Sequence, residues 1–306
     1  MDGKKWWRLA LRRNLLACFT TCMILGSSGL FFTFPCAFLA VNVSLLLPII
    51  TGILFLSCFT SFIITSFMDP GILQQGSDIS RHQNLDPQVV KVNGKVFYLK
   101  WCQVCQFYQP PRCSHCRLCN VCIEDFDHHC KWVNNCVGRR NYRFFFFFVF
   151  FLAIYMLTIL GSCLMYLIIN YNEPIMVEKS ATYAVLVPIT FFLFPVLFLF
   201  GAHTEFIALG VTMFEKYNKE EDRTNPFTRG WKRNFFIVLC GRIAPRYLGS
   251  LKKLETKRTS RKRDSQQASM ETEKLKASKK AKKKEIISKM IQGHTLRVPS
   301  HHKAQR

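Results

Sequence analysis

The side chains best suited to chemistry are concentrated in residues 102–143, which hold eight of the chain's 14 cysteines and three of its eight histidines. Structural zinc is bound by four Cys or His side chains, often in pairs two to four residues apart. Eight residues here fit that pattern and would make two Cys₃His sites: Cys102, Cys105, His115, Cys116, Cys119, Cys122, His129 and Cys136. An interleaved assignment would join Cys102, Cys105, His115 and Cys122 and leave the other four for the second site. Spacing alone does not determine it.

An iron–sulfur cluster is the competing interpretation of the same cysteines. Four of them recur every three residues, as in an iron–sulfur binding loop: Cys113, Cys116, Cys119 and Cys122. That interpretation leaves Cys102, Cys105 and the two histidines of the zinc pattern without a role. The proline that usually follows the last cysteine is also missing, because Cys122 is followed by Ile123. Zinc is therefore the favoured metal.

Setting aside the eight candidate ligands leaves Cys113, Cys130 and His128. Cys130 directly follows Asp127-His128-His129 and precedes Lys131. A thiolate is a nucleophile, and a neighbouring cation or metal favours its formation. His128 is placed to take the thiol proton, and Asp127 to hold the imidazole in one tautomer. If Cys130 were a ninth ligand, Asp127 and His128 would have no role, so we predict that Cys130 is a nucleophile.

Four long apolar blocks surround this stretch and must position it. Their approximate limits are Leu15–Phe34, Leu45–Phe67, Phe144–Ile169 and Tyr183–Leu209. Each is long enough to cross a hydrocarbon core of about 30 Å as a helix. The first block is not a cleaved signal peptide, because it is too long and a second span follows after a short linker.

The basic residues predict the orientation of these spans. Of 42 Lys and Arg residues, all but Lys179 lie in three segments on one side of the membrane: residues 1–14, 68–143 and 214–306. This bias places both termini and the cysteine segment in the cytosol. Attraction to anionic lipids explains most of the net charge of +23, so no nucleic-acid partner is needed. The reducing cytosol favours metal binding or catalysis over disulfides.

The predicted fold is an α-helical polytopic membrane protein, with four transmembrane helices and a cytosolic two-zinc cysteine-rich domain between helices 2 and 3. The five expected segments are an arm with spans one and two (1–67), the cysteine-rich domain (68–143), spans three and four (144–209), a membrane-proximal segment (210–249) and a basic, largely disordered tail (250–306). A hairpin is predicted around Asn93-Gly94. The piece Lys274–Ile291 is predicted to form a basic amphipathic helix on anionic membrane.

The predicted nucleophile should lie at the membrane surface, because a run of five phenylalanines begins 14 residues after Cys130. A membrane-embedded cavity beneath it would hold a fatty chain, while cytosolic Arg and Lys hold a phosphorylated carrier. Burying a 16-carbon chain at about 0.8 kcal/mol per methylene is worth on the order of 12 kcal/mol before opposing terms. Tyr155 lies roughly 17 Å into the third span by helical rise and is predicted to close the cavity.

Residues 10–241 resemble the DHHC family of protein S-acyltransferases. The resemblance is carried by the cysteine pattern with Asp127-His128-His129-Cys130, by Pro110-Pro111-Arg112, by Asp69-Pro70-Gly71 and by Asn234. The sequence departs from the family at Lys131, where many members have proline. It departs again at Thr212-Met213-Phe214-Glu215, where the family has Thr-Thr-x-Glu and this chain lacks one hydroxyl.

The resemblance implies that Cys130 accepts palmitate from palmitoyl-CoA, with His128 as base, and passes it to cysteines of cytosolic or membrane-associated proteins. It also implies the interleaved assignment, with two structural zinc ions, so that His129 is a ligand and not a catalyst. Arg112 and Tyr155 are predicted to contact the acyl-CoA donor. The resemblance also implies a location in an endomembrane, either the Golgi or the endoplasmic reticulum, with the plasma membrane as the alternative. The sequence names neither the protein substrates nor an accessory subunit.

Two other function classes compete with an acyltransferase. A membrane-tethered, zinc-dependent binding or scaffold protein without catalysis would not need a free Cys130. A metal transporter would need ionisable groups within several spans, and apart from His203 and Glu205 the four spans contain almost none. Both classes are less favoured because neither accounts for the free thiol beside His128.

Overall fold

The computed structural model of the chain describes residues 3–73, 88–218 and 225–245, with side chains from residue 15 onward. These residues belong to one compact unit spanning Met1–Leu248. The basic tail (250–306) and its predicted helix over Lys274–Ile291 lie outside the described residues.

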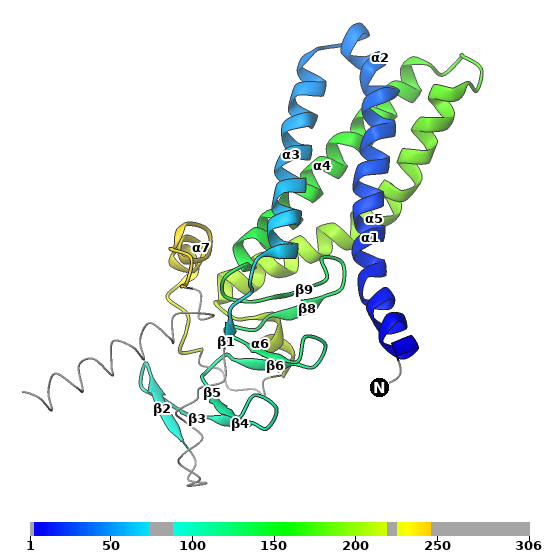
Figure 1. Ribbon diagram of the computed structural model, residues 1–306. Coiled ribbons are helices and arrows are strands. Elements are labelled where there is room, and N and C mark those ends of the chain that lie inside the picture. The colour runs from blue at the N-terminus through cyan, green and yellow to red at the C-terminus, as the bar shows by residue number, and fades with distance from the viewer. Residues whose placement is uncertain (1–2, 74–87, 219–224, 246–306) are drawn as a thin grey trace, which may run out of the picture. The chain divides into compact units, whose positions relative to one another are not determined.

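Four helical segments are long and apolar enough to cross a membrane, as the hydropathy pattern predicted: Leu15–Asn42, Leu46–Phe67, Tyr142–Ile169 and Val177–Leu209 (Figure 1). They comprise α1 (Gly3–Thr33) with α2 (Pro35–Asn42), then α3 (Leu46–Phe67), α4 (Tyr142–Ile169) and α5 (Val177–Leu209). Aromatic side chains fill the space between the helices; Phe62 of α3, for example, lies 5.3 Å from Phe148 of α4 between ring centroids.

Two segments expected to be connectors are helical. Residues 35–42 form α2, because Pro35 occupies the first turn of a helix, where a missing backbone N–H costs nothing. Lys179 lies inside α5, where it is buried and its ammonium group donates to the carbonyls of Tyr171 and Glu173. The hydropathy pattern did not predict the first turn of α5, because Glu178, Lys179 and Ser180 make that turn polar.

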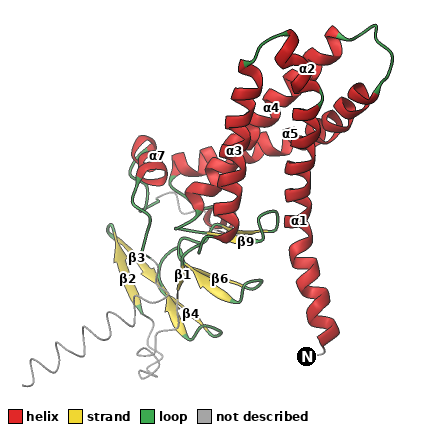
Figure 2. Ribbon diagram, turned by 45° about the horizontal axis from the view of Figure 1, so that its top comes forward, coloured by secondary structure: helices red, strands yellow, loops and turns green. Residues whose placement is uncertain are grey.

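The segment between α3 and α4 consists of short antiparallel strands (Figure 2). They are β1 (Ile72–Leu73), β2 (Val89–Val92), β3 (Lys95–Tyr98), β4 (Lys100–Cys102), β5 (Phe107–Gln109), β6 (Ser114–Cys116), β7 (Val121–Ile123), β8 (His128–Cys130) and β9 (Asn135–Val137). Pairs β2–β3, β4–β5 and β8–β9 are hairpins, and β1 joins the β6–β7 hairpin to make three strands. The β2–β3 turn has positive φ at Asn93 (48°) and Gly94 (85°), which confirms the predicted hairpin.

Polar contacts anchor the strands to the ends of the helices. Asp69, just after α3, accepts hydrogen bonds from the backbone N–H groups of Gly71 and Ile72, at 2.9 and 3.0 Å. Asn135 of β9 donates to the carbonyls of Thr65 and Met68 at the end of α3. The β8–β9 hairpin is thereby fixed against the end of a predicted membrane span.

The chain after α5 folds back onto the strands and helix ends. Helix α6 (Met213–Asn218) starts with a reciprocal cap, because Thr212 Oγ1 accepts from Glu215 N and Glu215 Oε2 accepts from Thr212 N. The missing second hydroxyl of the family motif therefore does not prevent the cap. Beyond it, α7 (Trp231–Cys240) is held by buried Asn234, whose amide donates to Ala208 O at the end of α5.

Candidate active site and metal centres

Three consecutive hairpins, β4–β5, β6–β7 and β8–β9, repeat the same local structure every 14 residues. Their first strands end at Cys102, Cys116 and Cys130. Each turn then contains a non-glycine residue with positive φ: Gln106 (56°), Asn120 (58°) and Asn134 (51°). In the first two turns a backbone N–H donates to the first cysteine: Cys105 N to Cys102 Sγ and Cys119 N to Cys116 Sγ, both at 3.4 Å. The sequence contains this 14-residue period, which our motif interpretation missed.

The eight predicted ligands gather into two groups with the interleaved membership. One group is Cys102, Cys105, His115 and Cys122, and the other is Cys116, Cys119, His129 and Cys136. Interleaving follows from strand geometry, because successive side chains of a strand point to opposite faces. His115 and Cys116 are neighbours in β6, so each joins a different group. His115 is paired across the hairpin with Cys122, and His129 with Cys136.

The ligand geometry fits tetrahedral zinc. In the first group His115 Nδ1 lies 3.6, 3.4 and 3.7 Å from the sulfurs of Cys102, Cys105 and Cys122. In the second group the corresponding distances from His129 Nδ1 are 3.7, 3.4 and 3.5 Å. Tetrahedral zinc with bonds of about 2.3 Å to sulfur and 2.0 Å to nitrogen separates the two atoms by about 3.5 Å. One imidazole nitrogen cannot hydrogen-bond three thiols at once, so a central cation explains the arrangement.

The charges of the second group also favour a cation. The Cys136 thiol donates a hydrogen bond to the Cys119 sulfur, which lowers the pKa of Cys119 to about 4 and raises the pKa of Cys136. This contact favours a thiolate at Cys119 and a protonated thiol at Cys136. A divalent cation at the centre would stabilise both thiolates together.

The third hairpin has the first cysteine of the repeated Cys-x-x-Cys pair, Cys130, but lacks the second. Val133 stands where the first two hairpins have Cys105 and Cys119, and it is buried at 1% exposure. Because side chains alternate along β8, His128 and Cys130 share one face while His129 between them points to the second metal group. Strand alternation alone thus separates the zinc ligand of this motif from the two residues predicted to react.

Asp127 and His128 are arranged as carboxylate and base. Asp127 is 1% exposed, and its Oδ2 lies 2.7 Å from His128 Nδ1, which donates to it in the tautomer that leaves Nε2 unprotonated. Burial lowers the pKa of His128, but the hydrogen bond to Asp127 and the contact with the Cys130 side chain outweigh it and raise the pKa to about 9. His128 is therefore a strong proton acceptor beside the thiol.

Cys130 opens onto an apolar cavity of about 220 Å³ between the helices. Its wall comes from α1, α4 and α5, and it includes Ile24, Phe148, Tyr155 and Val196. Tyr155 is 3% exposed, and its hydroxyl donates to Ser28 Oγ of α1 at 2.7 Å. The thiol and the Tyr155 ring therefore border one apolar space, which has the right chemistry for a hydrocarbon chain.

Residues 95–220 match the family model described as DHHC palmitoyltransferase. This stretch is therefore similar to a DHHC palmitoyltransferase domain, and we call it the DHHC domain. It is 40% identical over 241 residues to palmitoyltransferase ZDHHC5-A of Danio rerio, an alignment that covers 77% of this chain and 32% of that protein. It is also 41% identical over 238 residues to ZDHHC5 of Mus musculus and of Homo sapiens, covering 76% of this chain and 33% of each relative. The chain thus spans about a third of the length of these relatives.

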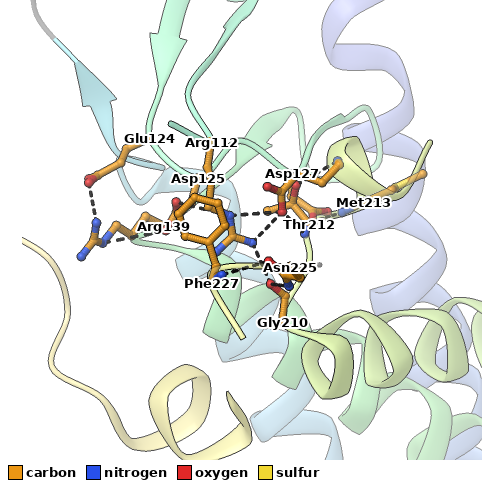
Figure 3. A network of polar contacts seen from close by, with 11 residues as sticks. Arg112, Glu124, Asp125, Asp127, Arg139, Gly210, Thr212, Met213, Asn225 and Phe227 are labelled. Carbon is orange, nitrogen blue, oxygen red and sulfur yellow. Dashed lines mark hydrogen bonds and ion pairs between the residues drawn. The ribbon is translucent and has the colours of Figure 1, made fainter. Parts of the chain in front are cut away.

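Arg112 of the DHHC domain joins the metal region to the segment after α5 (Figure 3). Its guanidinium donates to Glu215 Oε2 at 2.9 Å and to Gly210 O at 3.3 Å, and it stacks 4.9 Å from the centroid of the Phe227 ring. Nearby, Asp127 Oδ1 accepts from Met213 N at 2.7 Å. This last donor is a backbone group, so the methionine in place of the family's second threonine does not remove it.

His203 of α5 is a further buried residue beside Asp127 and His128. Its side chain is fully buried, its Nδ1 lies 3.0 Å from the hydroxyl of Tyr142, and its ring lies 5.9 Å from that of His128. Asp127, His128 and His203 form a third group whose polar atoms lie within 4.8 Å of one another. The sequence singled out His203 only as one of the few ionisable residues within the spans, not as a neighbour of His128.

Proposed function

We propose that this chain is a protein S-acyltransferase that transfers palmitate from palmitoyl-CoA to cysteine thiols through an acyl-enzyme on Cys130. The observation that carries this proposal is the position of the Cys130 thiol, beside His128 on one side and an apolar cavity on the other. The names of the relatives agree with it. A scaffold without catalysis would need neither the Asp127–His128 pair nor a cavity that meets a thiol.

The first step forms the acyl-enzyme. The thiol proton of Cys130 passes to Nε2 of His128, whose Nδ1–H stays on Asp127. The thiolate attacks the thioester carbonyl of palmitoyl-CoA, the bond to the CoA sulfur breaks, and that sulfur takes the proton from His128. The alkyl chain lies in the apolar cavity, where the Tyr155 ring is part of the wall.

The second step reverses the roles of the two thiols. A substrate cysteine gives its proton to His128 and attacks the carbonyl of the acyl-enzyme. The bond between the acyl carbonyl and Cys130 breaks, and the Cys130 sulfur takes the proton back from His128, which restores the starting thiol and neutral imidazole. Two zinc ions would be bound by the two Cys₃His groups, one linking the first hairpin to the second and the other linking the second to the third, and their role is structural.

We assign the termini and the DHHC domain to the cytosolic face, because all but one of the basic residues lie on that side of the four spans. The substrates are then cytosolic or membrane-associated proteins with accessible cysteines. From the family resemblance we expect the protein in the Golgi or the endoplasmic reticulum, with the plasma membrane as the alternative. The segment boundaries 1–67, 68–143, 144–209, 210–249 and 250–306 remain our working division.

The test is labelling with palmitoyl-CoA that carries a radioactive acyl group, followed by hydroxylamine, which cleaves thioesters. The unchanged chain should form a hydroxylamine-sensitive adduct, and Cys130→Ser should abolish both the adduct and transfer while zinc stays near two per chain. Cys113→Ser is the matched control, since Cys113 is also a free thiol of the same region, and it should leave labelling intact. A thioester that persists in Cys130→Ser excludes Cys130 as the nucleophile. The absence of any adduct on the unchanged chain would favour the non-catalytic alternative.

A further inference from the structure

A second cavity, of about 600 Å³, lies at the junction of the DHHC domain with the ends of α4 and α5 and with the α7 segment. It shares no lining residue with the apolar cavity at Cys130. Its size lies within the range of about 300–1,000 Å³ that is usual for small-ligand sites. Apart from the predicted contact of Arg112 with the acyl-CoA donor, the proposed transfer reaction gives this cavity no role.

The lining of this second cavity is strongly cationic. It contains six arginines, Arg112, Arg139, Arg140, Arg143, Arg229 and Arg242, and two carboxylates, Glu124 and Asp125. Two further carboxylates contact its arginines from outside the lining, Glu215 at Arg112 and Asp69 at Arg140. Even with all four carboxylates ionised, the six guanidinium groups leave a net charge of +2.

Three of the six arginines lie apart from these four carboxylates. Arg143 donates to the carbonyls of Val238 and Gly241, which do not neutralise its charge. In the part of the chain that the structure describes, no carboxylate forms an ion pair with Arg143, Arg229 or Arg242. They approach the cavity from different elements: Arg143 from α4, and the other two from either side of α7. A cavity lined by unneutralised guanidinium groups from separate segments of the chain is suited to an anion with several oxygens.

The cavity also lies at the level of the membrane surface. Tyr142, which lines it, is the first residue of α4, and Gly210 directly follows α5. The adjacent helix α7 exposes Trp231 and Phe236, at 61% and 64%, as expected of a helix lying in the headgroup layer. Basic pockets at the cytoplasmic ends of membrane helices are a known setting for phosphorylated lipid headgroups.

We propose that this cavity binds a phosphate-bearing ligand, and specifically the headgroup of a membrane lipid with phosphate monoesters, such as a phosphoinositide. The proposal rests on the cytosolic orientation proposed above. A phosphate held between Arg143 and the two arginines beside α7 would tie the C-terminal segment to the start of α4. The soluble phosphates of CoA share this chemistry, so the test must separate the two sources.

The test measures binding by the full chain in detergent, using calorimetry. The probe is a water-soluble, short-chain phosphatidylinositol bisphosphate, with CoA and inorganic phosphate as parallel arms. The altered chain is the double variant Arg229→Gln/Arg242→Gln. Its matched control is Lys232→Gln/Arg233→Gln, which removes the same charge from exposed positions of α7 that do not line the cavity.

We expect the cavity variant to weaken binding of the bisphosphate at least about tenfold, and the control variant to weaken it less than about twofold. Equal losses in both variants would show general surface attraction and overturn the proposal. Displacement of the probe by CoA at equal or lower concentration would assign the site to the soluble carrier instead.

A second measurement covers the case in which the cavity variant does not fold. The bisphosphate should raise the thermal unfolding temperature of the unchanged chain more than CoA or inorganic phosphate at the same concentration; equal or absent shifts overturn the lipid assignment. Neither readout needs acylation of Cys130, so failure of the proposed transferase activity would not be mistaken for failure of this site.

Discussion

Replacing Tyr155 by alanine tests the assignment of the apolar cavity most directly. The Tyr155 ring borders the cavity, and its hydroxyl bridges to Ser28 of α1 at 2.7 Å. Removing the ring enlarges the cavity beside Ile159, which lies one turn further along α4 and also lines it. One turn is about 5.4 Å of helix, which is room for at least two more methylene groups.

The expected magnitude follows from the burial of those methylenes. Each contributes about 0.8 kcal/mol when it leaves water, so an 18-carbon chain gains about 1.6 kcal/mol over a 16-carbon chain in the variant. Because about 1.4 kcal/mol corresponds to a tenfold change in an equilibrium constant, the ratio of stearoyl to palmitoyl transfer should rise by about 15-fold. The unchanged chain should disfavour stearate, because its last carbons meet the Tyr155 ring.

The assay is competition between palmitoyl-CoA and stearoyl-CoA for acyl-enzyme formation, read by mass spectrometry of the Cys130 peptide. Tyr155→Phe is the matched control, because it keeps the ring and loses only the bond to Ser28. It should cost about 1 kcal/mol of stability and leave the chain-length ratio near that of the unchanged chain. A Tyr155→Ala ratio equal to that of Tyr155→Phe would refute the reasoning.

Two further substitutions test the residues that surround the nucleophile. Arg112→Ala should lower the free energy of unfolding by roughly 3 kcal/mol, because Glu215, with a side chain 9% exposed, loses its cation; thermal unfolding measures this, and Arg112→Ala/Glu215→Gln should recover part of it. A raised KM for palmitoyl-CoA with unchanged stability would instead support the predicted contact of Arg112 with the donor. Val133→Cys should recreate the Cys-x-x-Cys of the first two hairpins. Diamide should then oxidise the new thiol and Cys130 to a disulfide and stop acyl-enzyme formation, and dithiothreitol should restore it. Val133→Ser should show no such reversible loss, and equal sensitivity of both variants to diamide would contradict the hairpin equivalence.

The metal ligands were predictable because they depend on residue chemistry and short spacing. All eight candidates lie within 102–136, and all eight gather in the two groups. Their division between groups was open in the spacing and was supplied only by family resemblance. A single rule of strand geometry accounts for it, since neighbours such as His115 and Cys116 must point to opposite faces. That rule applies only once β6 is known to be a strand.

The helices were predicted to within a few residues where hydropathy alone defines them. Leu45–Phe67 was expected, and α3 is Leu46–Phe67. The start of α5 was missed, because a buried lysine that donates to backbone carbonyls is indistinguishable in sequence from a solvated one. Lys179 finds those carbonyls only where the preceding loop passes beside the helix.

The sequence by itself determined what the parts are: four apolar spans, eight candidate metal ligands, and one thiol left beside a histidine and an aspartate. These depend on side-chain type, on hydropathy summed over about 20 residues and on spacing, all of which are local. Only the tertiary structure decided which distant residues meet. Arg112 pairs with Glu215, Tyr155 reaches Ser28, and His203 lies beside His128. Such contacts join elements roughly 75 to 130 positions apart, and their partners are selected by helix packing, which no local pattern encodes.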